Sequence, residues 1–100
     1  MKGKKIYIAG GITGVTDYKE HFAKAEEYLI SRGAIPMNPA RMSEGFEWKD
    51  YLHICLTMID VCEAVFLLNG WFDSAGARAE SFYADLYGKD KYYEDLEVAR

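Results

Sequence analysis

Glu80 follows a stretch of small residues and is the strongest candidate for chemistry in this sequence. Ala75, Gly76 and Ala77 would leave the start of a helix open, where the helix dipole attracts an anionic group. Helical side chains lean toward the N-terminus, so we expect the Glu80 carboxylate to point back toward that open end. An ionised carboxylate there could act as a nucleophile. A solvated glutamate at a favourable early helical position is the alternative.

A glycine-rich turn is the second feature that could bind a ligand, and it consists of Gly10, Gly11, Ile12, Thr13 and Gly14. It has neither the Rossmann spacing nor the Lys-Ser/Thr ending of a P-loop, so it predicts neither dinucleotide nor triphosphate binding. Its backbone N–H groups could still hold a phosphate or a ribose hydroxyl. An ordinary tight turn fits the same residues.

Trp71, Asp73 and Ser74 come just before the predicted third helix, and each has a candidate role. Trp71 could stack on a base or cover the edge of the sheet. Asp73 could carry a proton or cap the helix, and Ser74 could cap it as well.

His21 and His53 have no spacing that suggests a metal site, so no metal and no cofactor are predicted.

The two cysteines, Cys55 and Cys62, lie in one predicted helix about 10 Å apart, which excludes a disulfide between them. We expect buried thiols, as in a reducing cytoplasm.

The net charge of −4 and the pI near 5.1 argue against nucleic-acid binding. Residues 6–9 are too short for a membrane span or a signal-peptide core, so a cytoplasmic protein is expected.

The elements that position these residues alternate between strand and helix. Strands are predicted at residues 5–9, at 34–37 on the sheet edge because Pro36 cannot donate to a ladder, at 64–68 in the centre, and at 91–93. The first helix, at residues 17–32, would begin with a capping-box-like pair, Asp17 and Glu20. We expect the tail after the last strand, residues 94–100, to pack little.

Helical spacing of apolar residues predicts which helix faces are buried. The first helix would bury Phe22, Ala25 and Leu29. The second would present Trp48, Leu52, Cys55, Leu56 and Ile59, and the third would bury Ala79, Phe82, Tyr83 and Leu86.

This alternation predicts one α/β domain over residues 1–100, a flavodoxin-like three-layer sandwich with a parallel sheet of about four strands. Ligands of such sheets bind beyond the carboxyl ends of the strands. Tyr7 and Glu80 should therefore face one cleft. Ser74, the amides of Ala75 and Gly76, and the backbone of residues 10–13 should converge at the start of the third helix.

Residues 6–14, 62–71 and 73–80 together resemble a family of small phage and bacterial proteins, DUF4406, which looks like a compact branch of the nucleoside 2-deoxyribosyltransferase superfamily. The resemblance runs to about Tyr93, and the spacing from Gly76 to Glu80 is its most specific part. It implies that Glu80 attacks the anomeric carbon of a deoxyribonucleoside, releasing the base and leaving a glycosyl-enzyme ester. It also implies that Tyr7 sits near this nucleophile.

The resemblance further implies a substrate, either a deoxynucleoside or its monophosphate, whose 5′-phosphate would lie against the turn at residues 10–14. Ser74 resembles the serine of the nucleotide-hydrolysing members more than the aspartate of the transferases. Cys55 stands where the superfamily's enzymes usually carry an aspartate that helps handle the base. Asp60, Asp73 or a water would have to replace it, and both hydrolysis and base exchange stay open.

Two rival functions use the same scaffold without catalysis. One is a nucleotide-binding module, and the other is an interaction protein such as a phage accessory factor. In each case we expect a homo-oligomer, most simply a two-fold dimer, whose interface could use the aromatic residues around the second helix, Phe46, Trp48 and Tyr51.

Overall fold

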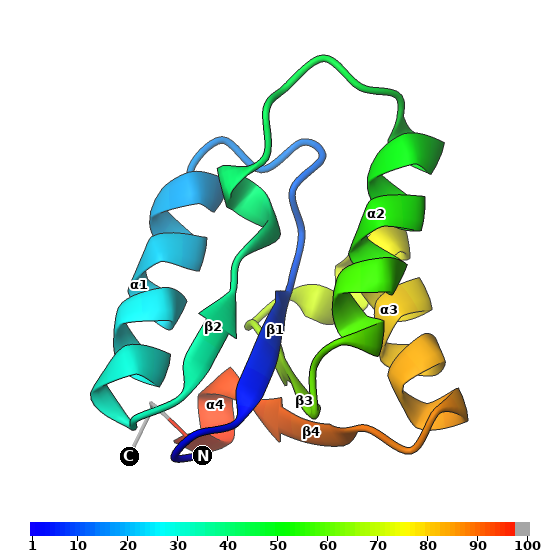
Figure 1. Ribbon diagram of the computed structural model, residues 1–100. Coiled ribbons are helices and arrows are strands. Elements are labelled where there is room, and N and C mark those ends of the chain that lie inside the picture. Colours follow the sequence, from blue (N-terminus) through cyan, green and yellow to red (C-terminus); the bar gives the residue numbers. More distant parts are fainter. Residues whose placement is uncertain (98–100) are drawn as a thin grey trace.

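Four parallel strands form one sheet in the order β2-β1-β3-β4. The computed structural model describes residues 1–97, and its strands are β1 (Lys5–Ala9), β2 (Ile35–Met37), β3 (Ala64–Leu67) and β4 (Asp90–Tyr93) (Figure 1). The α/β fold with a four-stranded parallel sheet is thus confirmed. β2 lies at the edge as predicted, and β1 shares the centre with β3.

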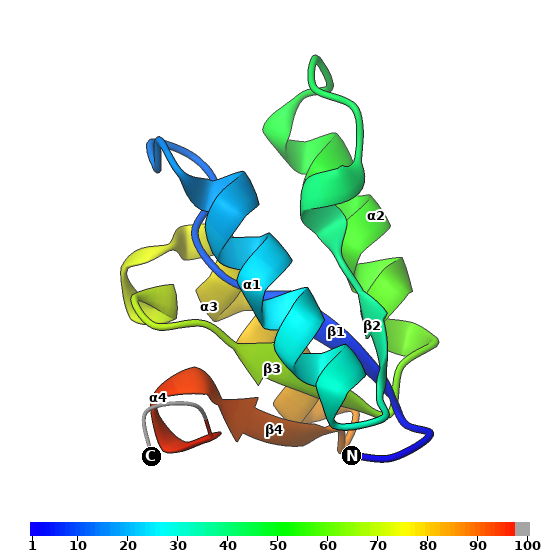
Figure 2. The ribbon, with the colours of Figure 1, turned by 90° about the vertical axis from the view of Figure 1, so that its left-hand side faces the viewer.

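Helices cover both faces of the sheet, which makes the three layers that the alternation predicted. α1 (Tyr18–Ser31) lies on one face, and α2 (Trp48–Asp60) and α3 (Ala75–Leu86) lie on the other (Figures 1 and 2). The side chains of β1 alternate between these faces, so Ile6 and Ile8 pack toward α1 while Tyr7 faces α2 and α3. The alternation of side chains along β1 therefore places Tyr7 on the face of the sheet that α3 covers.

α1 begins without the predicted capping pair. Asp17 makes no side-chain cap hydrogen bond, and its backbone angles, φ −114° and ψ 27°, are not those of the extended residue that caps a helix. The predicted inner face is confirmed, because Phe22, Ala25 and Leu29 are buried.

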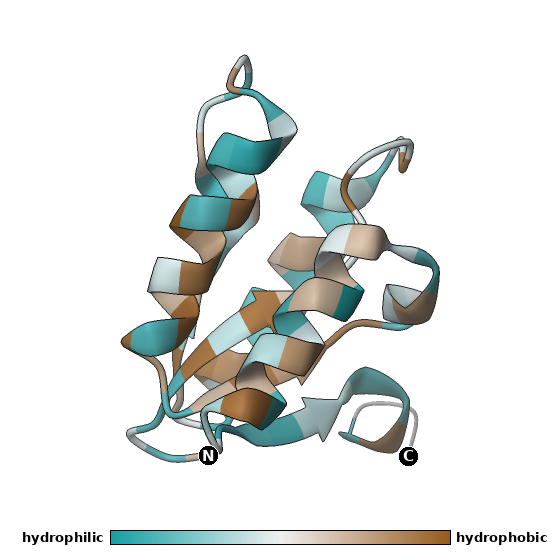
Figure 3. Cartoon of the chain, turned by 90° about the vertical axis from the view of Figure 1, so that its right-hand side faces the viewer, coloured by the Kyte–Doolittle hydropathy of each residue, from teal (hydrophilic) through white to brown (hydrophobic). Residues whose placement is uncertain are grey.

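The predicted inner face of α3 is wrong at Phe82 and Leu86, while Ala79 and Tyr83 are half-buried and Tyr83 packs against the core. Phe82 and Leu86 are 69% and 65% exposed, whereas Ala77, Glu80, Ser81 and Ala84 are buried. Small side chains let the helix axis approach the sheet closely, so α3 turns its small residues inward and leaves large apolar ones outside. Figure 3 shows apolar bands on the outer surface of α3. This rotation places Glu80 on the buried face.

The first turns of α2 extend beyond the strand ends (Figure 1). Of the predicted apolar face, Cys55 and Ile59 are buried, but Trp48 at the start of the helix is 54% exposed. Both cysteines are free and buried, as expected, but α2 ends at Asp60, so Cys62 lies beyond the helix in which the sequence places it. Among residues 1–97, no helix has the length and hydropathy that a membrane crossing requires.

The segment after β4 packs more than predicted. Residues Glu94–Glu97 form the short helix α4. One carboxylate oxygen of Glu94, Oε1, accepts a hydrogen bond from the backbone N–H of Asn69 at 2.7 Å and lies 3.0 Å from His21 Nε2. This carboxylate fixes the loop after β3 to α1. Residues 98–100 of the predicted tail lie outside the described part of the chain.

Candidate active site

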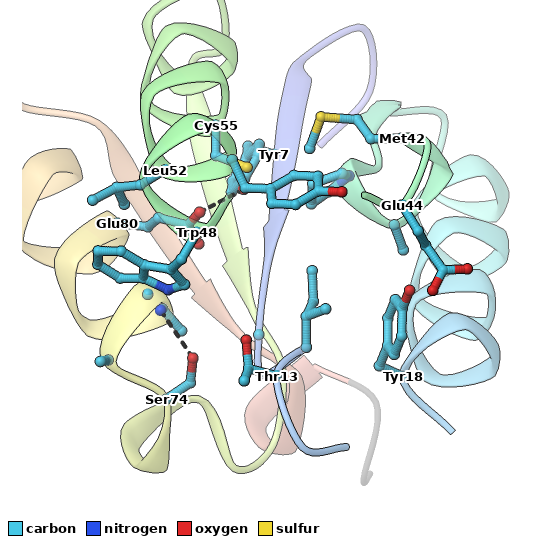
Figure 4. Close-up of a pocket in the computed structure, with 18 of the residues that line it drawn as sticks. Tyr7, Thr13, Tyr18, Met42, Glu44, Trp48, Leu52, Cys55, Ser74 and Glu80 are labelled. Carbon is cyan, nitrogen blue, oxygen red and sulfur yellow. Dashed lines mark hydrogen bonds between the residues drawn. The ribbon is translucent and has the colours of Figure 1, made fainter. Parts of the chain in front are cut away.

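A cavity of about 600 Å³ opens at the carboxyl ends of the central strands. Its walls come from the turn after β1, the start of α1, the loop between β2 and α2, the first turns of α2, and the start of α3. Figure 4 shows the side chains that these segments direct toward it. The cavity lies where the general rule for parallel sheets places a ligand.

Tyr7 and Glu80 meet in this cavity. The Tyr7 hydroxyl donates a hydrogen bond to Glu80 Oε2 at 2.7 Å (Figure 4). Tyr7 is 1% exposed and Glu80 is 7% exposed, and both line the cavity. The structure thus brings together two residues that are distant in the sequence, as their positions near the strand ends predict.

Burial changes the protonation of this pair. It raises the pKa of Glu80 to about 7, although the neighbouring Tyr7 hydroxyl and Cys55 thiol lower it. Glu80 therefore keeps its proton to a higher pH than the ionised carboxylate expected near an open helix start. Burial also raises the pKa of Tyr7 well above 10, so Tyr7 remains a hydroxyl that can donate to the carboxylate.

Cys55 lies beside the same two residues and lines the cavity. It is 4% exposed, and burial raises the pKa of its thiol to about 12. A thiol in this environment stays protonated and is a weak nucleophile. Cys55 therefore shapes the cavity without supplying a reactive anion or an effective acid.

The start of α3 forms a second part of the site. Ser74 caps the helix, because its Oγ accepts a hydrogen bond from the backbone N–H of Ala77 at 3.1 Å. Asp73, Ala75 and Gly76 line the cavity beside it. Of the two residues that could cap the helix, Ser74 does so and Asp73 is left at the cavity wall.

The glycine turn after β1 lies against the start of α3. Gly10, Ile12 and Thr13 line the cavity, whereas Gly11 and Gly14 are not among the lining residues. A Cβ atom added at Gly11 would lie 3.6 Å from Ser74 Cβ, so the two turns are in contact. Part of the turn therefore lies beside the start of α3, and the convergence of the backbone N–H groups on one point stays a prediction.

Trp71 lies elsewhere. It packs against Phe72 and Tyr93 with ring centroids 5.2 and 6.4 Å apart, and it is not among the cavity-lining residues. This position corresponds to the reading in which the aromatic ring covers the sheet edge. The aromatic wall of the cavity is instead supplied by Tyr18, Trp48 and Tyr51.

Several lining residues were not predicted from the sequence, among them Tyr18, Met42, Glu44 and Leu52. Met42 and Glu44 come from the loop between β2 and α2, which shows no periodicity in its sequence. Tyr51 holds this loop in place: its hydroxyl donates to the Ser43 carbonyl at 2.7 Å and accepts from the Phe46 N–H at 3.2 Å. The sequence signal for this wall is the concentration of aromatic residues at the start of α2, for which the sequence predicts an oligomer interface.

No group of three or more His, Cys, Asp or Glu side chains within residues 1–97 could hold a metal ion. His21 contacts Glu94, and His53 is exposed on α2.

Two solved structures share this fold at low sequence identity. A 2-desoxiribosyltransferase from Leishmania mexicana has a TM-score of 0.71 and 22% identity, covering 90% of this chain and 63% of that chain. A 2-deoxyribosyltransferase from Bacillus psychrosaccharolyticus has a TM-score of 0.70 and 23% identity, covering 89% and 70%. The chain thus spans less than two thirds of the Leishmania protein.

No curated protein matches the chain. A family model described as a domain of unknown function, DUF4406, matches residues 4–93. The chain therefore belongs to the DUF4406 family, and it has the fold of the 2-deoxyribosyltransferases.

Proposed function

We propose that the cavity carries out N-glycosidic bond chemistry on a deoxynucleoside or its 5′-monophosphate, with Glu80 as the nucleophile. The observation that carries this proposal is the Glu80 carboxylate, which lines the cavity, is 7% exposed, and accepts a hydrogen bond from Tyr7. A buried carboxylate held by a fixed donor is suited to trap an oxocarbenium-like carbon. The fold shared with two 2-deoxyribosyltransferases supports the same chemistry.

The reaction has two steps. A carboxylate oxygen of Glu80 forms a bond to C1′ while the bond from C1′ to the base nitrogen breaks, and the base takes the electron pair and a proton. In the second step a water or another base attacks C1′ and releases the Glu80 carboxylate. Water gives hydrolysis and a second base gives base exchange, and in both cases the attacking molecule loses a proton.

The two turns at the strand ends would hold the sugar. Ser74 uses a lone pair of its Oγ to cap α3, which leaves its hydroxyl proton available to a ligand. The adjacent backbone N–H groups of the helix start favour an oxygen atom or an anion. The 5′-hydroxyl or the 5′-phosphate of a nucleotide is the group that this end of the cavity would take.

The experiment is a screen for released base. The protein is incubated with deoxynucleosides and with their 5′-monophosphates, and the products are separated by chromatography. We expect release of the base by the unmodified protein and none by Glu80→Gln, while the control Glu20→Gln, an exposed carboxylate on α1, keeps the activity.

Calorimetry on the same ligands separates the rival functions. Glu80→Gln should still bind the ligand, because the amide keeps the size of the carboxylate. Binding without base release by the unmodified protein would replace the proposal with a nucleotide-binding module. The absence of any binding would indicate an interaction protein that uses only the scaffold.

The same titrations test for a phosphate site. If Ser74 and the start of α3 hold a phosphate, the monophosphate should bind roughly ten- to hundred-fold more tightly than the nucleoside, since a charge-assisted contact contributes about 1.5–3 kcal/mol. Equal affinities would remove the phosphate from the proposal and leave the nucleoside as the substrate.

A further inference from the structure

The charged side chains that the described residues contribute to the cavity are all acidic. Within the described residues 1–97, three carboxylates line it, those of Glu44, Asp73 and Glu80, and no lysine, arginine or histidine does. Lys19 Nζ lies 3.3 Å from Glu44 Oε2, but both side chains are largely exposed, and such a surface pair contributes little. The lining thus favours a ligand that carries a positive charge.

Aromatic rings stand among these carboxylates. Figure 4 shows Trp48 on one wall and Tyr18 with Glu44 on the opposite wall. Trp48 lines the cavity and is 54% exposed, so its side chain is accessible to a ligand. A planar cation between these walls would gain from the electron-rich faces of the rings as well as from the carboxylates.

The buried proton donors beside Glu80 are poor acids for a departing base. The Cys55 thiol, with a pKa of about 12, and the Tyr7 hydroxyl, whose pKa is well above 10, hold their protons too tightly to protonate a base efficiently. Glu80 is occupied as the nucleophile. A neutral base therefore depends on Asp73 or water for its proton, whereas a cationic base needs none.

We propose that this cavity selects nucleosides whose base carries a fixed positive charge on its ring, such as a pyridinium or an N-alkylated purine. The inference rests on the proposed function for its chemical step. There, the Glu80 oxygen bonds to C1′ as the bond to the ring nitrogen breaks, and the electron pair neutralises the ring cation. The base leaves as a neutral molecule, and water then attacks C1′, releasing a proton and restoring the carboxylate.

The test compares two ligands of nearly the same size that differ in charge, nicotinamide 2′-deoxyriboside and its uncharged 1,4-dihydro form. Calorimetry on the unmodified protein should show roughly tenfold tighter binding of the cation, the effect of a contact worth about 1.4 kcal/mol. Glu44→Gln and Asp73→Asn should each reduce this preference severalfold. The control Glu20→Gln, outside the cavity, should leave it unchanged.

Two readouts keep the inference and the proposed function apart. Equal affinity for the charged and uncharged ligands overturns the inference, even if neutral deoxynucleosides are cleaved and the proposed function stands. A charge preference that both cavity substitutions weaken supports the inference. Release of nicotinamide, compared with Glu80→Gln in the same buffer to correct for spontaneous hydrolysis, then decides whether the bound cation is also a substrate.

Discussion

At the scale of single residues, Glu80 is under two opposing effects. Burial favours its protonated form, and the hydroxyl of Tyr7 favours the carboxylate. Nucleophilic attack requires the carboxylate, so activity should rise as the pH increases through about 7, the pKa of Glu80. Burial and the hydrogen bond from Tyr7 together set how much of Glu80 is carboxylate near neutral pH.

Tyr7→Phe should move this rise in activity to higher pH. The phenylalanine removes the donor that lowers the pKa of Glu80, and a hydrogen bond to a charged group is worth about 1.5–3 kcal/mol, or roughly one to two pH units. The measurement is the rate of base release against pH. Tyr87→Phe is a matched control, because that ring is 59% exposed on the outside of the molecule. An unchanged profile in Tyr7→Phe would show that the hydroxyl does not tune Glu80.

Glu80 should also make the folded state less stable at high pH. Its pKa is about 7 when folded and near 4.5 when unfolded, so the folded chain binds more protons between these values. Stability is unaffected below about pH 4, falls between pH 4.5 and 7, and above pH 7 is lower by about 3 kcal/mol.

Glu80→Gln removes this loss of stability. The variant should unfold at a higher denaturant concentration than the unmodified protein at pH 8, and the two should converge near pH 4. Denaturant unfolding at both pH values checks this. A variant that is less stable at pH 8 would contradict the pKa of Glu80 on which the argument rests.

At the scale of elements, the turn after β1 is constrained by the core beneath it. A Cβ atom at Gly10 would lie 2.8 Å from Leu68 Cδ1 and 3.1 Å from Leu68 Cβ, and Leu68 is 1% exposed. Because the whole Leu68 side chain is close, it cannot simply rotate away. A residue with a side chain at this position must displace packed atoms.

Gly10→Ala should therefore destabilise the protein by about 1–3 kcal/mol, the usual effect of overpacking a core. Gly11→Ala is the neighbouring control, because its Cβ would meet nothing closer than Val15 Cγ2 at 3.4 Å. Denaturant unfolding of both variants measures the difference. Equal stability of the two would mean that Leu68 adapts at no cost.

The strands and helices were predictable because each has a periodic or continuously apolar pattern of its own. The buried side of α3 was not predictable from its pattern. The hydrophobic pattern points to Phe82 and Leu86, whereas close approach to the sheet selects the small residues. The pairing of Tyr7 with Glu80 followed from the topology. The cavity wall that contains Glu44 could not be predicted in this way, because an irregular loop has no periodic sequence pattern. Its shape depends on contacts such as the hydrogen bond from Tyr51 to the Ser43 carbonyl.

At the scale of the whole molecule, two exposed apolar surfaces are unusual for a small chain. Phe46 and Trp48 at the start of α2 are 56% and 54% exposed, and Phe82, Leu86 and Tyr87 on α3 range from 59% to 69%. Exposed apolar groups of this size commonly mark interfaces between proteins. The sequence-based expectation of a two-fold oligomer therefore remains a prediction with two candidate faces.

Sedimentation velocity at micromolar concentration should show a dimer or a larger closed oligomer. Phe46→Lys and Phe82→Lys place a charge on one face each, and the substitution that yields monomers identifies the interface. A monomeric unmodified protein at that concentration would contradict the prediction. Unchanged oligomers in both variants would place the contact elsewhere on the surface.

The burial of the site residues has a consequence for how this fold can diverge. Tyr7, Cys55 and Glu80 are packed into the molecule, so a change in the size of their side chains disturbs the core as well as the site. Thr13, Glu44 and Trp48 stand on the exposed rim, where most substitutions change stability by less than about 0.5 kcal/mol. Descendants of one ancestor can therefore exchange the molecule they recognise in a few tolerated steps while inheriting the same reactive centre.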